Sequence, residues 1–117
     1  MINIGDCYFS KKIEHLVIAV GKNDNKILIV SITSNSFDKS CKLEVDDIID
    51  NMGNQILKHT SYVGYRFSFE FEGFGTFEAF RKIYDFRCNI SNELLSKIKE
   101  GGRVSHHLQH RFKKYFL

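Results

Sequence analysis

A short polar segment in the middle of the chain carries the residue types best suited to chemistry. Lys58-His59-Thr60-Ser61-Tyr62 is closely followed by Tyr65-Arg66, so a titratable base, two cations, hydroxyl groups and two aromatic rings lie within a few positions of one another. Metal-independent RNA cleavage needs such groups. A base removes the proton of the 2′-OH, cations stabilise the crowded phosphorane, and an acid protonates the leaving 5′-oxygen. Aromatic rings can stack on an unpaired base.

From this segment we predict two catalytic groups, His59 and Arg66, and three substrate-binding groups, Lys58, Ser61 and Tyr62. The structural alternative is a polar loop at the entry to a strand, in which the serine and tyrosine hydroxyls satisfy backbone groups.

Two further candidates stand at the ends of neighbouring apolar runs. His15 opens the run His15–Val20, and Thr33-Ser34 closes the run Lys26–Ile32. If the two runs form an antiparallel hairpin, these ends meet at one rim. We therefore predict His15 as a third catalytic residue and Thr33 and Ser34 as phosphate ligands. The alternatives are a structural histidine at a strand end and hydroxyls that close a turn.

The C-terminal region is basic although the rest of the chain is slightly acidic. Residues 1–95 hold 11 basic and 13 acidic side chains, a net charge of −2, whereas residues 96–117 hold six basic and one acidic, a net charge of +5. We predict that Arg103, His106 and Arg111 bind a phosphate backbone. The alternative is the solvated face of a helix that docks through Leu108 and Phe112.

Composition narrows the function classes. A chain of 117 residues with 43% hydrophobic side chains fits one folded domain. The three cysteines are widely spaced with no C-x-x-C pair, which indicates neither a disulfide framework nor a zinc site and favours a reducing, cytoplasmic compartment. His106 and His110 are one helical turn apart, but no third ligand can be assigned, so we expect no metal site.

Several other functions lack their signatures. No apolar stretch approaches the ~20 residues of a spanning helix, so we expect no membrane contact. The spacings of a phosphate-binding nucleotide loop, a zinc protease helix and a serine nucleophile elbow are absent, so we expect no cofactor.

The element pattern is mainly that of strands. The strongest prediction is the hairpin of 15–20 and 26–32 around the turn-forming segment 21–25, with both strands buried on two faces. Residues 4–9 and 41–45 also read as strands. Around 46–50 the sequence fits either one helical turn capped by Asp46 or an acidic loop.

Two aromatic-rich segments follow. Residues 65–71 predict a strand with Tyr65, Phe67, Phe69 and Phe71 on one inner face. Residues 76–87 fit both helix and strand, and we favour a helix.

The C-terminal third predicts helices. Ser91 is a suitable N-cap, Gly101-Gly102 a suitable end, and Ser105 the cap of a second helix. The sequence therefore predicts a single domain over 1–117, mainly β within the α+β class. It consists of a barrel body at 1–72, a connection and helix at 73–100, and a basic helical tail at 103–117.

Five segments, in order, resemble the MazF/PemK-like toxins. Ile4–Tyr8 is similar to the family's opening "GD" strand, His15–Val20 to its Arg-Pro-hydrophobic strand, and Ile29–Ser34 to its "V-x-P-I-T-S" segment. Ser61–Val63 is similar to a serine-hydrophobic segment, and Ile90–Leu95 to the start of its last helix.

The sequence also departs from the family pattern. Glu14-His15 stands where the family has Arg-Pro, and Ser31 where it has proline. Thr33 is the active-site position that the resemblance carries over.

The resemblance implies a small SH3-like barrel, a homodimer, and cleavage of single-stranded RNA under the control of a protein antitoxin. The alternative function is a non-catalytic SH3-like module that binds nucleic acid or a protein.

Overall fold

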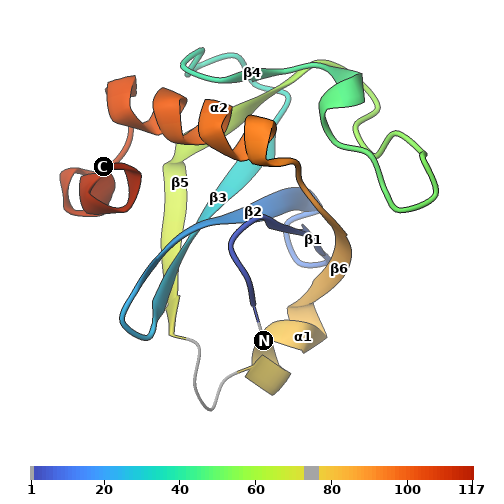
Figure 1. Cartoon of the computed structure of the whole chain (residues 1–117), viewed down its shortest axis with the longest axis horizontal. Coiled ribbons are helices and arrows are strands. Elements are labelled where there is room, and N and C mark those ends of the chain that lie inside the picture. The colour runs from blue at the N-terminus through green and yellow to red at the C-terminus, as the bar shows by residue number, and fades with distance from the viewer. Residues whose placement is uncertain (1, 73–76) are drawn as a thin grey trace.

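The computed structural model describes residues 2–72 and 77–117 and shows a curled antiparallel sheet, a half-barrel, with short helices (Figure 1). The six strands have the order β4-β5-β3-β2-β1-β6. Their bounds are β1 Asp6–Ser10, β2 His15–Asn23, β3 Lys26–Thr33, β4 Lys42–Leu43, β5 Ser61–Glu72 and β6 Tyr84–Asn89. The helices are α1 Phe77–Ile83 and α2 Asn92–Val104, with 3₁₀ turns η1 Val45–Asp47 and η2 His110–Phe116. The predicted mainly β, barrel-like fold class is confirmed.

The central hairpin is the one that the sequence predicts. β2 and β3 pair antiparallel, and nearly all of their inner residues are buried, since apolar side chains cover both faces of the sheet. The turn is shorter than expected, because Gly21 lies within β2 and only Asp24 and Asn25 separate the strands. A Cβ at Gly21 would lie 3.0 Å from the ring of Tyr115, so the glycine allows η2 to approach the strand.

Two apolar clusters lie on opposite faces of the sheet. The larger packs inward-facing side chains such as Ile18 and Val30 against Ile98 of α2 and Phe112 and Phe116 of η2. The smaller joins Val17 and Ile29 to Phe80 of α1. Alternate residues of the hairpin thus serve different cores, which explains why both strands are continuous apolar runs.

The aromatic side chains of β5 do not share one face, contrary to the prediction from the sequence. Tyr65 is fully buried in the larger cluster, Phe69 and Phe71 pack against the smaller one, and Phe67 is 58% exposed. The register with β3 changes between the pairs Ile29–Phe69 and Ser31–Gly64, so β5 contains extra residues there. A bulge breaks the two-residue period, and the four rings therefore do not share a face.

The segment 76–87 was predicted to be helical, and only its first part is. Helix α1 ends at Ile83, and β6 begins at Tyr84 and pairs with β1. The alternation of Tyr84, Phe86 and Cys88 is typical of a strand, and the unpaired edge of β1 provides the partner. Phe77 falls at the start of α1, and residue 76 lies outside the described residues.

Helix α2 begins as predicted but ends later. The Ser91 hydroxyl accepts the N–H of Leu94 at 3.1 Å. The predicted end at Gly101-Gly102 is wrong, because the helix continues to Val104 and both glycines are buried. A methyl group at Gly101 would overlap the hydroxyl of Tyr65, and one at Gly102 would overlap the ring of Phe116. The glycines therefore serve close packing rather than termination.

The tail also differs from the predicted second helix. Ser105 is the C-cap of α2, and the chain then forms the 3₁₀ segment η2 after Gln109. The predicted apolar side chains are buried: Leu108, Phe112, Tyr115 and Phe116.

The segment between β3 and β5 contains little regular structure. The strand predicted at 41–45 is reduced to the two residues of β4. The segment 46–50 matches neither alternative fully. A 3₁₀ turn covers Val45–Asp47, with Glu44 rather than Asp46 as its N-cap residue, and residues 48–50 are not helical. Within the described residues, no helix has the length and apolar character required to cross a membrane.

Candidate active site

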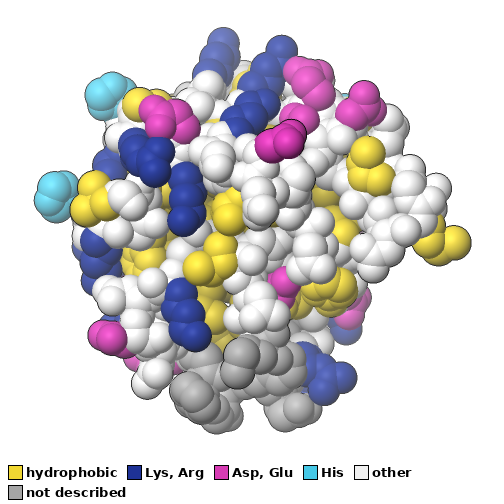
Figure 2. Space-filling model, in the orientation of Figure 1, with side chains coloured by type: hydrophobic (Ala, Val, Ile, Leu, Met, Phe, Trp, Pro, Cys, Tyr) yellow, Lys and Arg dark blue, Asp and Glu magenta, His cyan; other side chains and the backbone are white. Residues whose placement is uncertain are grey.

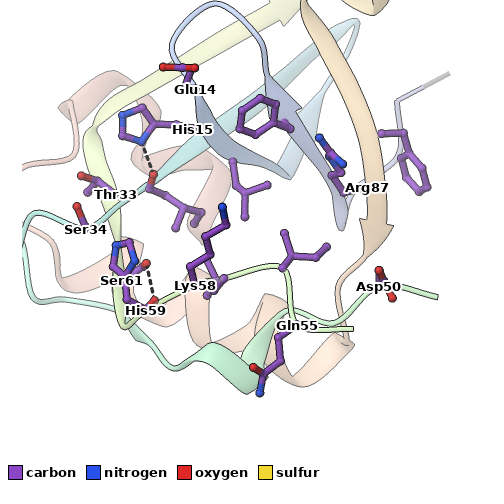
Figure 3. A pocket seen from close by; sticks show the side chains of 16 residues that line it. Glu14, His15, Thr33, Ser34, Asp50, Gln55, Lys58, His59, Ser61 and Arg87 are labelled. Carbon is purple, nitrogen blue, oxygen red and sulfur yellow. Dashed lines mark hydrogen bonds between the residues drawn. The ribbon is translucent and has the colours of Figure 1, made fainter. Parts of the chain in front are cut away.

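An open pocket of about 800 Å³ gathers six of the predicted site residues (Figure 3). It lies where β2 starts and β3 ends, and the loop before β5 and the strands β1 and β6 complete it. The predicted residues in its lining are His15, Thr33, Ser34, Lys58, His59 and Ser61. The hairpin geometry brings His15 near Thr33, as expected from the sequence.

His15 is exposed, and one of its ring nitrogens is fixed. Nδ1 lies 2.8 Å from the carbonyl oxygen of Ile32. A carbonyl only accepts, so Nδ1 carries the hydrogen and donates. In the neutral ring this leaves Nε2 as an acceptor of protons. The contact therefore selects the tautomer that a general base requires.

Hydroxyl groups extend this side of the pocket. The Thr33 oxygen accepts the backbone N–H of Asn35 at 3.1 Å, which leaves its hydroxyl hydrogen to donate. Ser61 is buried and donates to the carbonyl of His59 at 3.0 Å, so it holds the loop on which His59 stands. In the view of Figure 3, His15, Thr33, Ser34 and His59 lie along one side of the pocket.

Two exposed cations complete the pocket. Lys58 extends toward the middle in the view of Figure 3, and Arg87 lies on the side opposite the histidines. Within residues 2–72 and 77–117, neither cation has a carboxylate within ion-pair distance. Cations without acidic partners are suited to binding phosphate oxygens.

Sequence reasoning missed Arg87. In the ladder between β1 and β6, Cys7 pairs with Cys88 and Tyr8 pairs with Phe86, so Arg87 is the extra residue of a bulge. Its guanidinium lies 5.2 Å from the centroid of the Phe9 ring. Bulges often redirect a side chain next to a functional site. The strand-like alternation at 84–88 could have predicted the strand that carries Arg87, whereas the pairing of that strand with β1 brings Arg87 to the pocket.

Two carboxylates, Glu14 and Asp50, lie at the edges of the pocket in Figure 3. Asp50 accepts the backbone N–H groups of Asn54 and Met52, each at 2.9 Å, and these bonds hold the pKa of Asp50 below its usual value. Asp50 therefore stabilises its own turn as an anion. Glu14 is exposed in the turn before β2.

Two residues of the predicted central segment lie outside the pocket. Tyr62 is half-buried in β5, between Thr33 of β3 and Lys42 of β4. Arg66 points elsewhere, because its guanidinium lies over the rings of Phe37 and Phe67. The structure thus does not bring Arg66 to the histidines.

The predicted tail residues Arg103, His106 and Arg111 do not line the pocket either. Arg103 donates to the carbonyl of Phe116 and to Glu100. Lys113 donates to the carbonyls of Gly102, Arg103 and Ser105, at 2.9, 3.3 and 2.7 Å. Arg103 and Lys113 therefore connect the tail to the end of α2 through hydrogen bonds to backbone carbonyls.

The face of the molecule that carries α2 and the tail has mixed charge. Figure 2 shows lysine and arginine side chains there together with acidic ones, rather than a continuous basic stripe. Among the described residues, no group of three His, Cys, Asp or Glu is arranged to hold a metal ion.

Comparisons of the chain with models of protein families, with curated proteins and with solved structures gave no match.

Proposed function

We propose that this protein is a metal-independent endoribonuclease that cleaves single-stranded RNA in the pocket of His15, His59 and Lys58. One observation carries the proposal. In the part of the chain that the structure describes, two exposed histidines, two cations that form no ion pair and the hydroxyls of Thr33 and Ser34 surround a single open pocket. Attack of an RNA 2′-oxygen on the adjacent phosphate needs such groups: a base, an acid, and cations or hydrogen-bond donors that stabilise the phosphorane.

The reaction divides among these groups as follows. Nε2 of His15 takes the proton of the 2′-OH, and the 2′-oxygen attacks the phosphorus. As this bond forms, the bond from phosphorus to the 5′-oxygen breaks, and protonated His59 gives its proton to the leaving oxygen. The products are a 2′,3′-cyclic phosphate and a 5′-hydroxyl.

The cations and hydroxyls act on the charge of the phosphate. Lys58 stabilises the negative charge that builds up on the phosphorane oxygens, and Thr33 donates a hydrogen bond to one of them. Arg87 holds a neighbouring phosphate of the same strand. Ser61 acts indirectly, as a positioning residue for the His59 loop.

The resemblance to MazF/PemK-like toxins supports the same proposal from the sequence. Thr33, the position that the resemblance carries over, lies in the pocket with both histidines. The proposal therefore includes a protein antitoxin as inhibitor and a homodimer as the active form.

The test uses the purified full chain with fluorescent single-stranded RNA in the presence of EDTA. We expect cleavage that leaves 2′,3′-cyclic phosphate ends. We expect His15→Ala and His59→Ala each to lower kcat/KM by roughly 10²- to 10⁴-fold. Lys58→Ala should also lower kcat, whereas Lys82→Ala, which removes an exposed lysine of α1, should not.

Other results would contradict the proposal. Folded wild-type protein that binds RNA in a salt-dependent way without cutting it would indicate the non-catalytic binding module instead. Full activity in both histidine variants would show that the site assignment is wrong. In cells, expression should arrest growth, and the two histidine variants should relieve that arrest.

A further inference from the structure

A second, smaller hollow adjoins the candidate active site at Thr33. It has a volume of about 120 Å³, and Thr33 belongs to the lining of both. Two of its phenylalanines are mainly in solvent, with Phe37 59% and Phe67 58% exposed. Single exposed apolar residues are common, but two exposed rings at one hollow form a surface suited to binding. We call Phe37, Arg66 and Phe67 the aromatic platform.

The β5 bulge exposes two consecutive residues of this platform. A regular strand turns one of two neighbours inward, yet Arg66 and Phe67 are both exposed. Exposure of Phe67 forgoes the stabilisation that its burial would give. Beneath it, Gly64 leaves room, since a Cβ there would lie 3.1 Å from the Phe67 ring and 3.3 Å from Thr33.

Neighbouring groups hold the platform in place. The Arg66 guanidinium lies 5.2 Å from the centroid of the Phe37 ring and 5.4 Å from that of Phe67. The His107 ring packs against Phe37 at a centroid distance of 4.4 Å. The Phe37 backbone N–H donates to the side chain of Asn35 at 2.8 Å, which fixes the loop. The rings therefore lose little conformational entropy when they bind a ligand.

The chemistry of the platform matches an unpaired base. Aromatic faces stack on bases of any sequence, and an arginine adds charge for the adjoining phosphate. Within the described residues Arg66 has no carboxylate partner, so its charge remains for a ligand.

We infer that the aromatic platform binds one nucleobase of the RNA strand whose phosphate lies in the neighbouring pocket. Thr33 joins the two sites, so a single strand can pass from one to the other. The inference rests on the proposed ribonuclease function and gives that site a base-binding subsite.

The test separates binding from cleavage. A 2′-O-methyl RNA oligonucleotide cannot be cut, and 2-aminopurine placed at successive positions reports stacking by quenching. We expect strong quenching at one position. Phe37→Leu and Phe67→Leu keep an apolar side chain but lose the ring, and each should abolish the quenching and weaken binding roughly 5- to 150-fold.

Matched variants check the interpretation. Phe67→Tyr should keep the quenching, because it keeps the ring. Met52→Ala, at a side chain that is 85% exposed and outside both hollows, should leave binding unchanged. The thermal midpoints of the leucine variants should match that of the wild type, which shows that they fold.

Each outcome addresses one claim. Quenching without any cleavage of ordinary RNA would refute the ribonuclease and support the subsite. Cleavage with undiminished quenching in both leucine variants would refute the subsite alone. If the leucine variants convert a dimer to a monomer in sedimentation, the platform is a protein contact, and the inference is overturned.

Discussion

Asp38 is a buried carboxylate that connects the loop after β3 to the end of α2. Only 6% of it is exposed, and its two oxygens accept from the hydroxyls of Ser105 and Ser40, each at 2.6 Å. Burial alone would raise the pKa of Asp38, but these hydrogen bonds outweigh it, and the pKa lies below its usual value. The ionised form is thus part of the native structure.

Ser105→Ala should destabilise the protein in a pH-dependent way. A hydrogen bond to a buried charge contributes about 1.5–3 kcal/mol, so we expect a loss of that size at pH 7 in urea unfolding. Because the folded pKa is depressed, this contribution is present above the unfolded pKa and disappears as the pH falls below about 4. The difference from wild type should therefore shrink toward pH 3. Ser36→Ala, in the same loop but exposed, should have little effect at either pH.

The three cysteines are buried thiols, and two of them face each other across β1 and β6. The hydrogen bond with Cys88, together with burial, raises the pKa of Cys7, whereas that bond lowers the pKa of Cys88. Burial also raises the pKa of Cys41. Reaction of a thiol requires an exposed thiolate.

We expect all three thiols to react slowly with an aromatic disulfide reagent at pH 8 while the protein is folded. In guanidinium chloride all three should react rapidly. A thiol that reacts at the unfolded rate in the native protein would contradict the burial seen here. Absorbance at the wavelength of the released thiolate gives both rates.

At the scale of elements, the absence of side chains at two glycines allows α2 to pack closely against its neighbours. Gly101 and Gly102 allow Tyr65 and Phe116 to approach the helix backbone, and the Tyr65 hydroxyl donates to the carbonyl of Ile98. Helix propensity alone would favour alanine at both glycines by about 1 kcal/mol each. Packing instead disfavours alanine at these positions, because an added methyl group would overlap neighbouring side chains.

Gly101→Ala should therefore lower stability. The added methyl group overlaps the hydroxyl of Tyr65 and the side chain of Cys41, and overpacking of this kind costs about 1–3 kcal/mol. Ser96→Ala provides the control, since Ser96 is exposed on the same helix and should be neutral or slightly stabilising. The comparison uses thermal unfolding followed by circular dichroism. A rise in midpoint for Gly101→Ala would show that the close contact is absent.

At the scale of the whole molecule, the tail is part of the core rather than an appendage. Phe112 and Phe116 are 1% and 0% exposed, and they share one cluster with Ile18 of β2 and Ile98 of α2. Removal of residues 103–117 would therefore disturb folding, so RNA binding by the tail has to be tested with point variants.

Phe112→Ala should reduce the free energy of unfolding by about 3–5 kcal/mol, because it leaves a large cavity in the main core. The loss should appear in a single transition for sheet and tail, as expected for one cooperative domain. Arg111→Gln changes an exposed neighbour and should leave stability nearly unchanged. A separate early transition in Phe112→Ala would indicate that the tail folds independently.

The sequence by itself determined the features that depend on neighbouring residues. The hairpin of β2 and β3 follows from two apolar runs around a short turn, and the start of α2 follows from Ser91. Because that hairpin is antiparallel, the sequence also placed His15 beside Thr33. Such local features need no knowledge of the rest of the chain.

Only the tertiary structure decided the features that depend on distant partners. The bulge in β5 turns Phe67 outward, and the pairing of β6 with β1 places Arg87 in the pocket. The glycine pair of α2 continues a helix because Tyr65 and Phe116 approach it. Bulges and close contacts arise from pairing between segments far apart in sequence. The period of one segment alone therefore does not show where its pattern breaks.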